Sequence, residues 1–452
     1  MRLKSIVLIG CMLASLSILS SCQSPNDRSS SSKIDAGGDA GADEDSGTDD
    51  DSGVDASTVD DGGFNYKPDT KGHPGPKGIL TGRVMAPSGK FPISGALVYV
   101  TFFDGSDIPN ELFCYECDDM TNKVWTLTDA EGRFELKDVP ADTLNIVSRK
   151  GFFQRQREIT VKADKSQEVP QEYTTLPKQN STNGLDHIPS YAVLLNPADY
   201  IEDLLAKIGL ADLDEYGHLE YGTEQFDLYD DLKTAKTSVG SSLGLVSSED
   251  KMSDYHQIFF PCPCDKLKAW KYSDTLKNYV SLGGRVYASC IAFPWINQKF
   301  PKLDKDKDGN ELPGPFDDVI TYANTYSTYK TKGEILDKDV RDWLGAIDPS
   351  IDLDNVPINS AATVVDNIVD KVYPGHGLKE NDGYVRPKVW VKDIETNVNK
   401  PMTITFNYDC GKVYYSPFHV VENAPSVDIR PQEWILTYLL FEVGVCEGEY
   451  IE

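Results

Sequence analysis

The sequence predicts a multidomain chain in which an antiparallel β-sandwich (Greek key) precedes an α/β domain with a doubly wound, mostly parallel sheet. Two observations support this fold class. Residues 78–177 contain short alternating apolar segments separated by turn residues, without helical periodicity, which is typical of antiparallel sandwiches. Residues 188–452 instead alternate buried-strand runs with amphipathic helical segments, which is typical of parallel sheets covered by helices.

Residues 1–21 have the parts of a secretion signal. Arg2 and Lys4 form a positive start, and the apolar run at 6–19 is shorter than the roughly 20 residues that span a membrane. The segment ends in Leu19-Ser20-Ser21-Cys22, which resembles the lipobox of bacterial lipoproteins. This resemblance implies cleavage before Cys22, a lipid on its thiol, and anchoring of an exported protein to the cell envelope. An outer-membrane anchor, facing the periplasm or the surface, is the expected location. An ordinary signal peptide with a chance cysteine is the alternative.

Residues 22–75 are predicted to form a disordered acidic tether. Ser, Gly, Asp and Ala dominate this segment, so it cannot bury enough apolar surface to offset the entropy of ordering. Its acidic runs repel one another and extend the chain. Calcium binding by these acids is an alternative to a solvated charge run. The whole chain has a formal net charge of -28, which argues against a nucleic-acid partner because phosphate contacts need basic patches.

The predicted sandwich contains six short strands bounded by turn residues. They lie at 79–84, 96–100, 124–128, 133–136, 144–147 and 158–161. Between the strands, Asp129 is placed to accept from nearby backbone amides, and Gly132 permits a positive φ. Residues 82–84, 93–98, 128–134 and 138–140 together resemble the carboxypeptidase regulatory-like domain, which has a transthyretin-like fold. The resemblance implies a module for adhesion, spacing or stability, without catalysis.

The second domain is predicted from strands and helices that alternate along the chain. Strands are expected at 191–195, 257–260, 285–289, 402–406 and 413–416, and helices at 200–208, 267–282, 334–347, 361–372 and 431–443. In open sheets of this kind, binding sites form beyond the carboxyl ends of the strands.

Four segments of this domain, at 255–262, 283–290, 411–419 and 431–433, together resemble the class I glutamine amidotransferase-like fold in its divergent lipoprotein form. The resemblance implies a nucleophilic cysteine at a strand-to-helix elbow, with a histidine and a glutamate supplied late in the chain. Cys290, His419 and Glu422 match these positions, and such a set can activate a thiolate. Two features depart from the family pattern. Ser289 and Ile291 replace flanking glycines, and Glu422 lies one residue too far from His419.

Seven cysteines remain after removal of Cys11 and lipidation of Cys22. They are Cys114, Cys117, Cys262, Cys264, Cys290, Cys410 and Cys446. Export favours disulfides, and an odd number leaves at least one thiol free or paired between molecules. We expect Cys114 to pair with Cys117 and Cys410 with Cys446. Cys290 could be oxidised with Cys262, or these two could join Cys264 and His419 in a zinc site.

An acidic insertion resembles the first half of a calcium loop. Asp304, Asp306, Asp308 and Asn310 occupy every second position, with a glycine directly after Asp308. Oxygen donors in this pattern suit a hard cation. The twelfth loop position is Pro315 instead of the usual glutamate, so Asp317 or Asp318 would have to complete the shell. A solvated acidic turn is the alternative.

The leading interpretation is a lipid-anchored exported protein whose α/β domain binds an unidentified ligand or envelope partner without catalysis. The alternatives are a cysteine-dependent hydrolase that uses Cys290, His419 and Glu422, and a purely structural envelope protein. A close contact between Cys290 and His419 would favour the hydrolase.

Overall fold

The structure is a computed structural model. It describes residues 69–104, 108–231, 235–262, 269–296, 316, 320–323, 328–368, 387–419 and 426–446. The chain divides into Met1–Asn65 and Tyr66–Glu452, and the described residues belong to the second unit. The predicted signal peptide and nearly all of the predicted tether lie outside them. None of the described helices is long and apolar enough to span a membrane.

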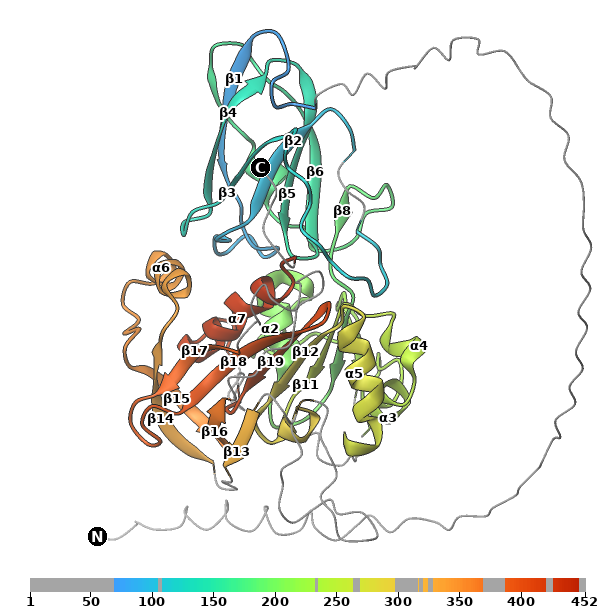
Figure 1. Cartoon of the computed structure of the whole chain (residues 1–452), viewed down its shortest axis with the longest axis vertical. Coiled ribbons are helices and arrows are strands. Elements are labelled where there is room, and N and C mark those ends of the chain that lie inside the picture. Colours follow the sequence, from blue (N-terminus) through green and yellow to red (C-terminus); the bar gives the residue numbers. More distant parts are fainter. Residues whose placement is uncertain are drawn as a thin grey trace, which may run out of the picture. The chain divides into compact units, whose positions relative to one another are not determined.

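The first part of the described chain is a β-sandwich of two sheets (Figure 1). One sheet has the order β4(Arg133–Pro140), β1(Lys77–Arg83), β7(Ser166–Glu168). The other has the order β3(Val124–Leu127), β2(Leu97–Thr101), β5(Thr143–Lys150), β6(Phe153–Thr160), β8(Asp186–His187). Alternate residues of β4 are buried, as expected when one face of a strand packs on a core. Leu80 and Leu136 of the first sheet share a buried cluster with Val98 and Ile146 of the second. Each of the six predicted strands overlaps a strand of this sandwich.

The turn between β3 and β4 forms as the sequence predicts. Asp129 Oδ1 accepts a hydrogen bond of 2.7 Å from the Arg133 N–H. Gly132 has φ +73°, and a side chain there would collide with the Val84 carbonyl. Glycine is therefore needed at this position both for its backbone conformation and for the space it leaves.

A nine-stranded sheet forms the second part, which we call the mixed-sheet domain (residues 188–446). Its order is β10(Asp227–Tyr229), β9(Tyr191–Leu194), β11(Gln257–Phe260), β12(Arg285–Ser289), β19(Gly411–Ser416), β18(Pro401–Tyr408), β17(Lys388–Asp393), β14(Tyr329–Ile335), β15(Val356–Ala361). The five strands from β10 to β19 are parallel. From β19 to β15 every neighbouring pair is antiparallel. The expectation of a mostly parallel sheet is therefore wrong, because only half of the sheet is parallel.

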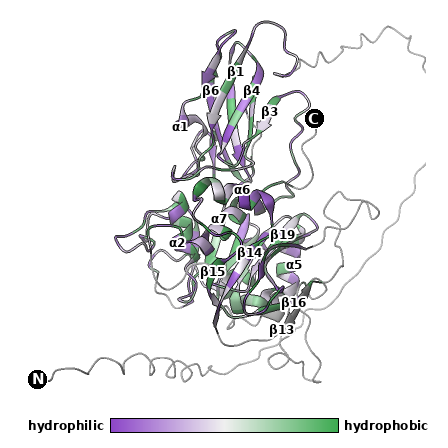
Figure 2. Cartoon of the chain, turned by 90° about the vertical axis from the view of Figure 1, so that its left-hand side faces the viewer, coloured by the Kyte–Doolittle hydropathy of each residue, from purple (hydrophilic) through white to green (hydrophobic). Residues whose placement is uncertain are grey.

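Helices contact both faces of the parallel half of the sheet. On one face, Phe259 and Tyr287 share a buried cluster with Leu204 of α2(Ile201–Leu205) and Leu436 of α7(Pro431–Val443). On the other face, neighbouring strand residues cluster with Leu276 of α5(Ser273–Ser281). Every residue of β9, β11 and β12 is buried, as expected for strands covered on both faces, and all of them except Gln257, Arg285 and Ser289 are apolar or aromatic. Figure 2 shows α7 with both hydrophobic and hydrophilic residues, and most of its residues are buried.

Shorter helices and a small sheet complete the described parts of the chain. The short helix α1(Gln171–Thr174) belongs to the sandwich. The further elements of the mixed-sheet domain are the π-helix η1(Ala206–Leu210), α3(Ser242–Val246), α4(Glu249–Met252), the 3-10 helices η2(Ala269–Tyr272) and η3(Cys290–Trp295), α6(Lys338–Ile347), and the strands β13(Ile320–Ala323) and β16(Val364–Ile368). β13 and β16 pair with each other.

Two helical predictions in the antiparallel half need correction. The predicted helix at 361–372 is wrong, because this region contains the end of β15 and the strand β16. Its β-branched residues Val364 and Val365 favour a strand, although their spacing also suits a helix. The helix predicted at 334–347 starts later, as α6. Asp337 caps α6 by accepting from the Val340 N–H at 3.0 Å.

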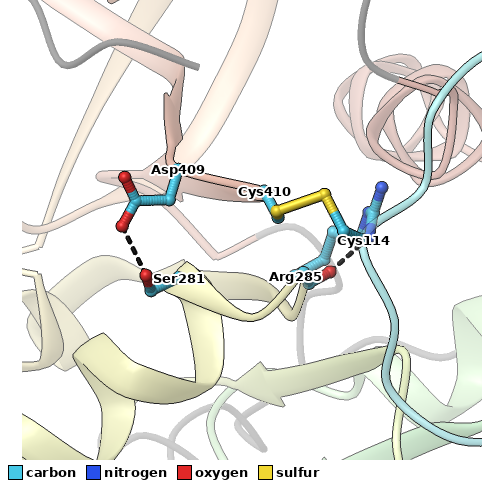
Figure 3. The surroundings of a disulfide bond; sticks show 6 residues. Cys114, Ser281, Arg285, Asp409 and Cys410 are labelled. Atoms are coloured by element: carbon cyan, nitrogen blue, oxygen red, sulfur yellow. Dashed lines mark hydrogen bonds between the residues drawn. A yellow bond between two sulfur atoms is a disulfide. The ribbon is translucent and has the colours of Figure 1, made fainter. Parts of the chain in front are cut away.

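Two disulfides link the sandwich to the mixed-sheet domain. Cys114 pairs with Cys410, and Cys117 pairs with Cys446. The four disulfide candidates are thus all bonded, but the predicted pairing of Cys114 with Cys117 and of Cys410 with Cys446 is wrong. Figure 3 shows Cys410 beside Asp409, whose carboxylate accepts a hydrogen bond from Ser281 at the end of α5. The loop after β2 packs against this region, which brings its cysteines to distant partners.

Candidate functional site

The carboxyl ends of three parallel strands bring two thiols and an imidazole together. Cys262 follows β11, Cys290 follows β12 and His419 follows β19. Their sulfur and ring nitrogen atoms all lie within 4.8 Å of one another, and no other group of this kind occurs among the described residues. Neither cysteine is in a disulfide. Cys290 is 1% exposed and Cys262 3%, whereas His419 is partly exposed.

Cys290 has an unusual backbone conformation. Its φ is +52°, at the point where β12 ends and η3 begins. A left-handed conformation at a non-glycine residue costs about 1–3 kcal/mol and persists only where its surroundings enforce it. Tyr415 Oη donates to the Cys290 carbonyl at 2.8 Å and also hydrogen-bonds the Thr363 hydroxyl. The positive φ of Cys290 therefore forms although its neighbours are Ser289 and Ile291 and not glycines.

A buried carboxylate fixes the two cysteine segments relative to each other. Ser289 Oγ donates to Asp199 Oδ2 at 2.5 Å and accepts from the Cys262 N–H at 3.1 Å. Asp199 and Ser289 are both fully buried. Because the same hydroxyl bonds both groups, Asp199 helps to set the distance between Cys262 and Cys290.

The Cys262 thiol is held in its neutral form. Burial raises its pKa far above the ordinary value, and a hydrogen bond with Cys290 acts in the same direction. A hydrogen bond with His419 opposes this shift without reversing it. Cys262 is therefore a protonated thiol near neutral pH, in contact with both other members of the cluster.

Both backbone polar groups of His419 are hydrogen-bonded. Its N–H donates to the Ser360 carbonyl at 3.0 Å, and its carbonyl accepts from Gln432 Nε2 at 2.8 Å. Gln432 Oε1 in turn accepts from the Asn359 N–H at 3.1 Å. Gln432 lies in the first turn of α7, so the start of this helix positions the imidazole segment.

The structure brings together two of the three predicted catalytic residues, Cys290 and His419. Several predicted residues lie outside the described residues, namely Cys22, Cys264, Glu422, Asp304, Asp306, Asp308 and Asn310. No sequence pattern indicated the hydrogen bonds of Asp199, Ser289 or Gln432. Gln432 belongs to a segment that carried the family resemblance, which was the one signal that could have drawn attention to it. Asp199 had no such signal, because its partner is 90 residues away.

Comparisons with known proteins do not identify a family. No family model matches the chain, and no curated protein matches it. A β-galactosidase from Bacillus circulans sp. alkalophilus is similar with a TM-score of 0.29 and 10% identity, covering 57% of this chain and 31% of its own. A cytoplasmic protein from Salmonella typhimurium is similar with a TM-score of 0.31 and 11% identity, covering 56% of this chain and 98% of its own. The TIE protein of Bacillus anthracis has a TM-score of 0.16 and 12% identity, covering 26% of this chain and 19% of its own.

These similarities establish neither fold nor function, since no TM-score reaches 0.5. The chain also spans only about a third of the length of the β-galactosidase.

Proposed function

We propose that the mixed-sheet domain is a cysteine-dependent hydrolase in which Cys290 is the nucleophile and His419 the general base. The observation that carries this proposal is the positive φ of Cys290 at the end of a buried parallel strand, within 4.8 Å of an imidazole nitrogen. A turn of this kind places a nucleophile at the edge of a sheet, beyond the end of its strand. The close contact favours the hydrolase over the ligand-binding protein without catalysis that the sequence first suggested.

The chemistry follows from the two side chains. His419 takes the proton of the Cys290 thiol, and the thiolate attacks a carbonyl carbon. A sulfur–carbon bond forms as the bond to the leaving group breaks, and the imidazolium returns the proton to that group. Water then hydrolyses the thioester, with His419 again acting as the base. The resemblance to the amidotransferase-like fold implies that Glu422 orients the imidazole of His419.

A zinc centre is the second candidate, and the proximity of Cys262 favours it. Two sulfurs and one nitrogen within 4.8 Å suit a tetrahedral ion with Zn–S distances of about 2.3 Å and Zn–N distances of about 2.0 Å. Three protein ligands would leave one position for water. Cys290 would then be a ligand and could not act as a nucleophile.

We also propose the finer assignments that the sequence suggested. Helices on both faces of the parallel strands support a doubly wound, amidotransferase-like domain. The turn at Asp129 and Gly132 supports a carboxypeptidase regulatory-like sandwich. The lipobox at Cys22 supports export and a lipid anchor in the envelope. Labelling with a radioactive fatty acid tests the anchor, since a Cys22→Ser variant should incorporate no label and leave the membrane fraction.

The experiment on the hydrolase follows alkylation of Cys290 by iodoacetamide across pH in the mature protein, with peptide mapping. We expect rapid labelling below the usual cysteine pKa of about 8.5, and at least tenfold slower labelling in His419→Gln. His73→Gln, which changes a histidine of the sandwich, is the matched control. Hydrolysis of 4-nitrophenyl acetate should be lost in Cys290→Ser.

The zinc candidate predicts a different set of results. About one zinc per chain in the purified protein, lost in Cys262→Ser, Cys290→Ser and His419→Gln alike, would support the metal centre and overturn the hydrolase. A disulfide between Cys262 and Cys290 in protein isolated from its native compartment would contradict both functions.

A further inference from the structure

A small acidic cavity lies at the same edge of the sheet as Cys290. It has a volume of about 110 Å³. Its walls come from the segment after β9, from α2, from the Tyr221 turn, and from Asp230 directly after β10. Since β9, β10 and β12 are parallel strands of one sheet, the cavity and Cys290 both lie beyond carboxyl ends.

Two buried carboxylates line this cavity. Glu202 and Asp230 are each 4% exposed. Glu202 Oε2 has no hydrogen-bond partner among the described residues. A buried carboxylate oxygen without a partner is costly, so the site favours a ligand that can donate to it or carry positive charge.

Neighbouring groups add to the negative character of the cavity. Burial, followed by the charge of Asp203 and then those of Asp199 and Asp230, raises the pKa of Glu202 well above its ordinary range. The pKa of Tyr221 also rises, to about 12, through burial and then the charges of Glu202, Asp203 and Asp230. A cation in the cavity would offset the repulsion among these groups.

The walls favour an organic ammonium group over a metal ion. Among the described residues, the carboxylates here do not form a group of three close enough to hold an ion. The remaining lining includes the rings of Tyr200 and Tyr221 and the apolar side chains of Leu195 and Pro197. Aromatic rings attract ammonium groups, and apolar walls suit an alkyl stem.

The cavity is connected to the nucleophile segment through Asp199. This residue lies between Pro197 and Tyr200 of the cavity wall, and its carboxylate accepts from Ser289, the neighbour of Cys290. β9 and β12 are separated by one strand, which places their ends roughly 10 Å apart at the usual strand spacing.

We propose that the cavity binds a protonated primary amine in the acyl part of the substrate, with Glu202 and Asp230 as its partners. The inference rests on the proposed hydrolase for the reaction itself. It adds the substrate class, which is an ester or amide whose acyl chain ends in an ammonium group. About five or six bonds would separate the carbonyl carbon from the nitrogen, to match the strand separation.

The binding experiment is independent of catalysis because it uses the full mature chain with Cys290→Ser. Calorimetric titration with n-butylammonium chloride should show binding, and n-butanol should not bind. Glu202→Gln and Asp230→Asn should each weaken butylammonium binding at least tenfold, since each removes a carboxylate of the site. Glu215→Gln, at an exposed acid outside the cavity, is the matched control and should leave binding unchanged.

The catalytic experiment compares kcat/KM for 4-nitrophenyl 6-aminohexanoate and 4-nitrophenyl hexanoate. We expect a preference of at least tenfold for the amino ester, which falls in Glu202→Gln and stays in Glu215→Gln. Binding of butylammonium without hydrolysis would support the cavity and reject the hydrolase. Hydrolysis of both esters at similar kcat/KM, without binding of butylammonium, would support the hydrolase and reject the ammonium cavity.

Two results would overturn the ammonium site. Equally tight binding of butanol and butylammonium would show that charge is irrelevant. Binding of calcium with the same dependence on Glu202 would indicate a metal site.

Discussion

Cys114, in the loop after β2, is joined by a disulfide to Cys410, in the turn between β18 and β19, across 296 residues of sequence. A second disulfide, between Cys117 and Cys446, spans 329 residues. The two bonds are close together in sequence, because Cys117 lies 3 positions after Cys114 and Cys446 lies 36 positions after Cys410. This arrangement makes the stability effects of the two bonds depend on each other.

Removal of one disulfide should cost much less than removal of both. With one bond intact, the other closes a loop of about 40 residues, and in the chain-entropy model Cys114→Ala/Cys410→Ala should lower the free energy of unfolding by about 4 kcal/mol. Removing the second bond then opens a loop of about 300 residues and should cost about 5–6 kcal/mol more. Urea denaturation of the single and double knock-outs measures both steps.

The matched control is the reciprocal variant Cys117→Ala/Cys446→Ala, which should cost nearly the same as the first. Non-reducing peptide mapping checks the connectivity itself. A peptide that contains a Cys114–Cys117 bond would contradict the structure.

These pairings show what local sequence could and could not predict. The bounds of β11, β12 and α7 were predicted to the residue, because continuous apolar runs and a proline at Pro431 mark them locally. The disulfide pairing depends on which turn the loop after β2 reaches, and no local pattern encodes that. The antiparallel half was missed for a related reason, since β14 pairs with β15 and with β17, which lies more than 50 residues further along the chain.

The sequence likewise predicts some residues of the candidate site and not others. Cys290 and His419 could be predicted because each sits in a segment that carries a family resemblance. The contact of Cys262 with both depends on the order of β11, β12 and β19 in the sheet. Glu202 and Asp230 lie 28 positions apart on segments that follow different strands, so their shared cavity leaves no sequence signal.

The strained turn at Cys290 predicts that glycine is more stable than alanine at this position, which is the opposite of the usual order. At an ordinary position, glycine destabilises relative to alanine by about 0.5–1 kcal/mol. At φ +52°, alanine carries the strain and glycine does not, so Cys290→Gly should be about 1 kcal/mol more stable than Cys290→Ala. Thermal or urea unfolding of the two variants measures the difference.

Cys262 provides the control for this comparison, because it is not among the described residues with positive φ. Cys262→Gly should be less stable than Cys262→Ala. If alanine were also preferred at position 290, the elbow conformation would not be present in solution.

The buried ion pair between Lys207 and Glu433 predicts a large effect from removing one charge. Lys207 Nζ lies 2.8 Å from Glu433 Oε2, and both side chains are 1% exposed. Lys207→Met leaves a buried carboxylate without its partner and should destabilise by about 3–5 kcal/mol. Lys207→Met/Glu433→Gln should recover part of this loss, since the amide oxygen can still accept from the Arg430 N–H.

Denaturant titration of these variants should include Lys332→Met as the control. Lys332 pairs with Glu395 on the surface, where both side chains are about half exposed, and the loss should stay below about 1 kcal/mol. Equal effects at the two sites would mean that the Lys207 pair is hydrated.

A buried histidine predicts how stability changes with pH. Nδ1 of His256 accepts from the Ser190 N–H at 2.9 Å, so Nε2 carries the proton and donates to the Pro109 carbonyl at 2.9 Å. Burial lowers the pKa of His256 to about 3, and the charges of His187 and Arg285 act in the same direction.

Because the unfolded chain takes up a proton at an ordinary pKa of about 6.5, stability is unaffected above pH 6.5 and falls as the pH drops from 6.5 towards 3. At pH 5 the contribution of His256 to this loss is about 2 kcal/mol. In His256→Gln, the decrease in unfolding free energy between pH 7.5 and pH 5 should therefore be about 2 kcal/mol smaller than in the unaltered chain, whatever the offset at pH 7.5. Urea titrations at both pH values measure this difference. Parallel decreases in the two proteins would show that the imidazole is protonated in the folded state, and that the Ser190 N–H does not donate to Nδ1.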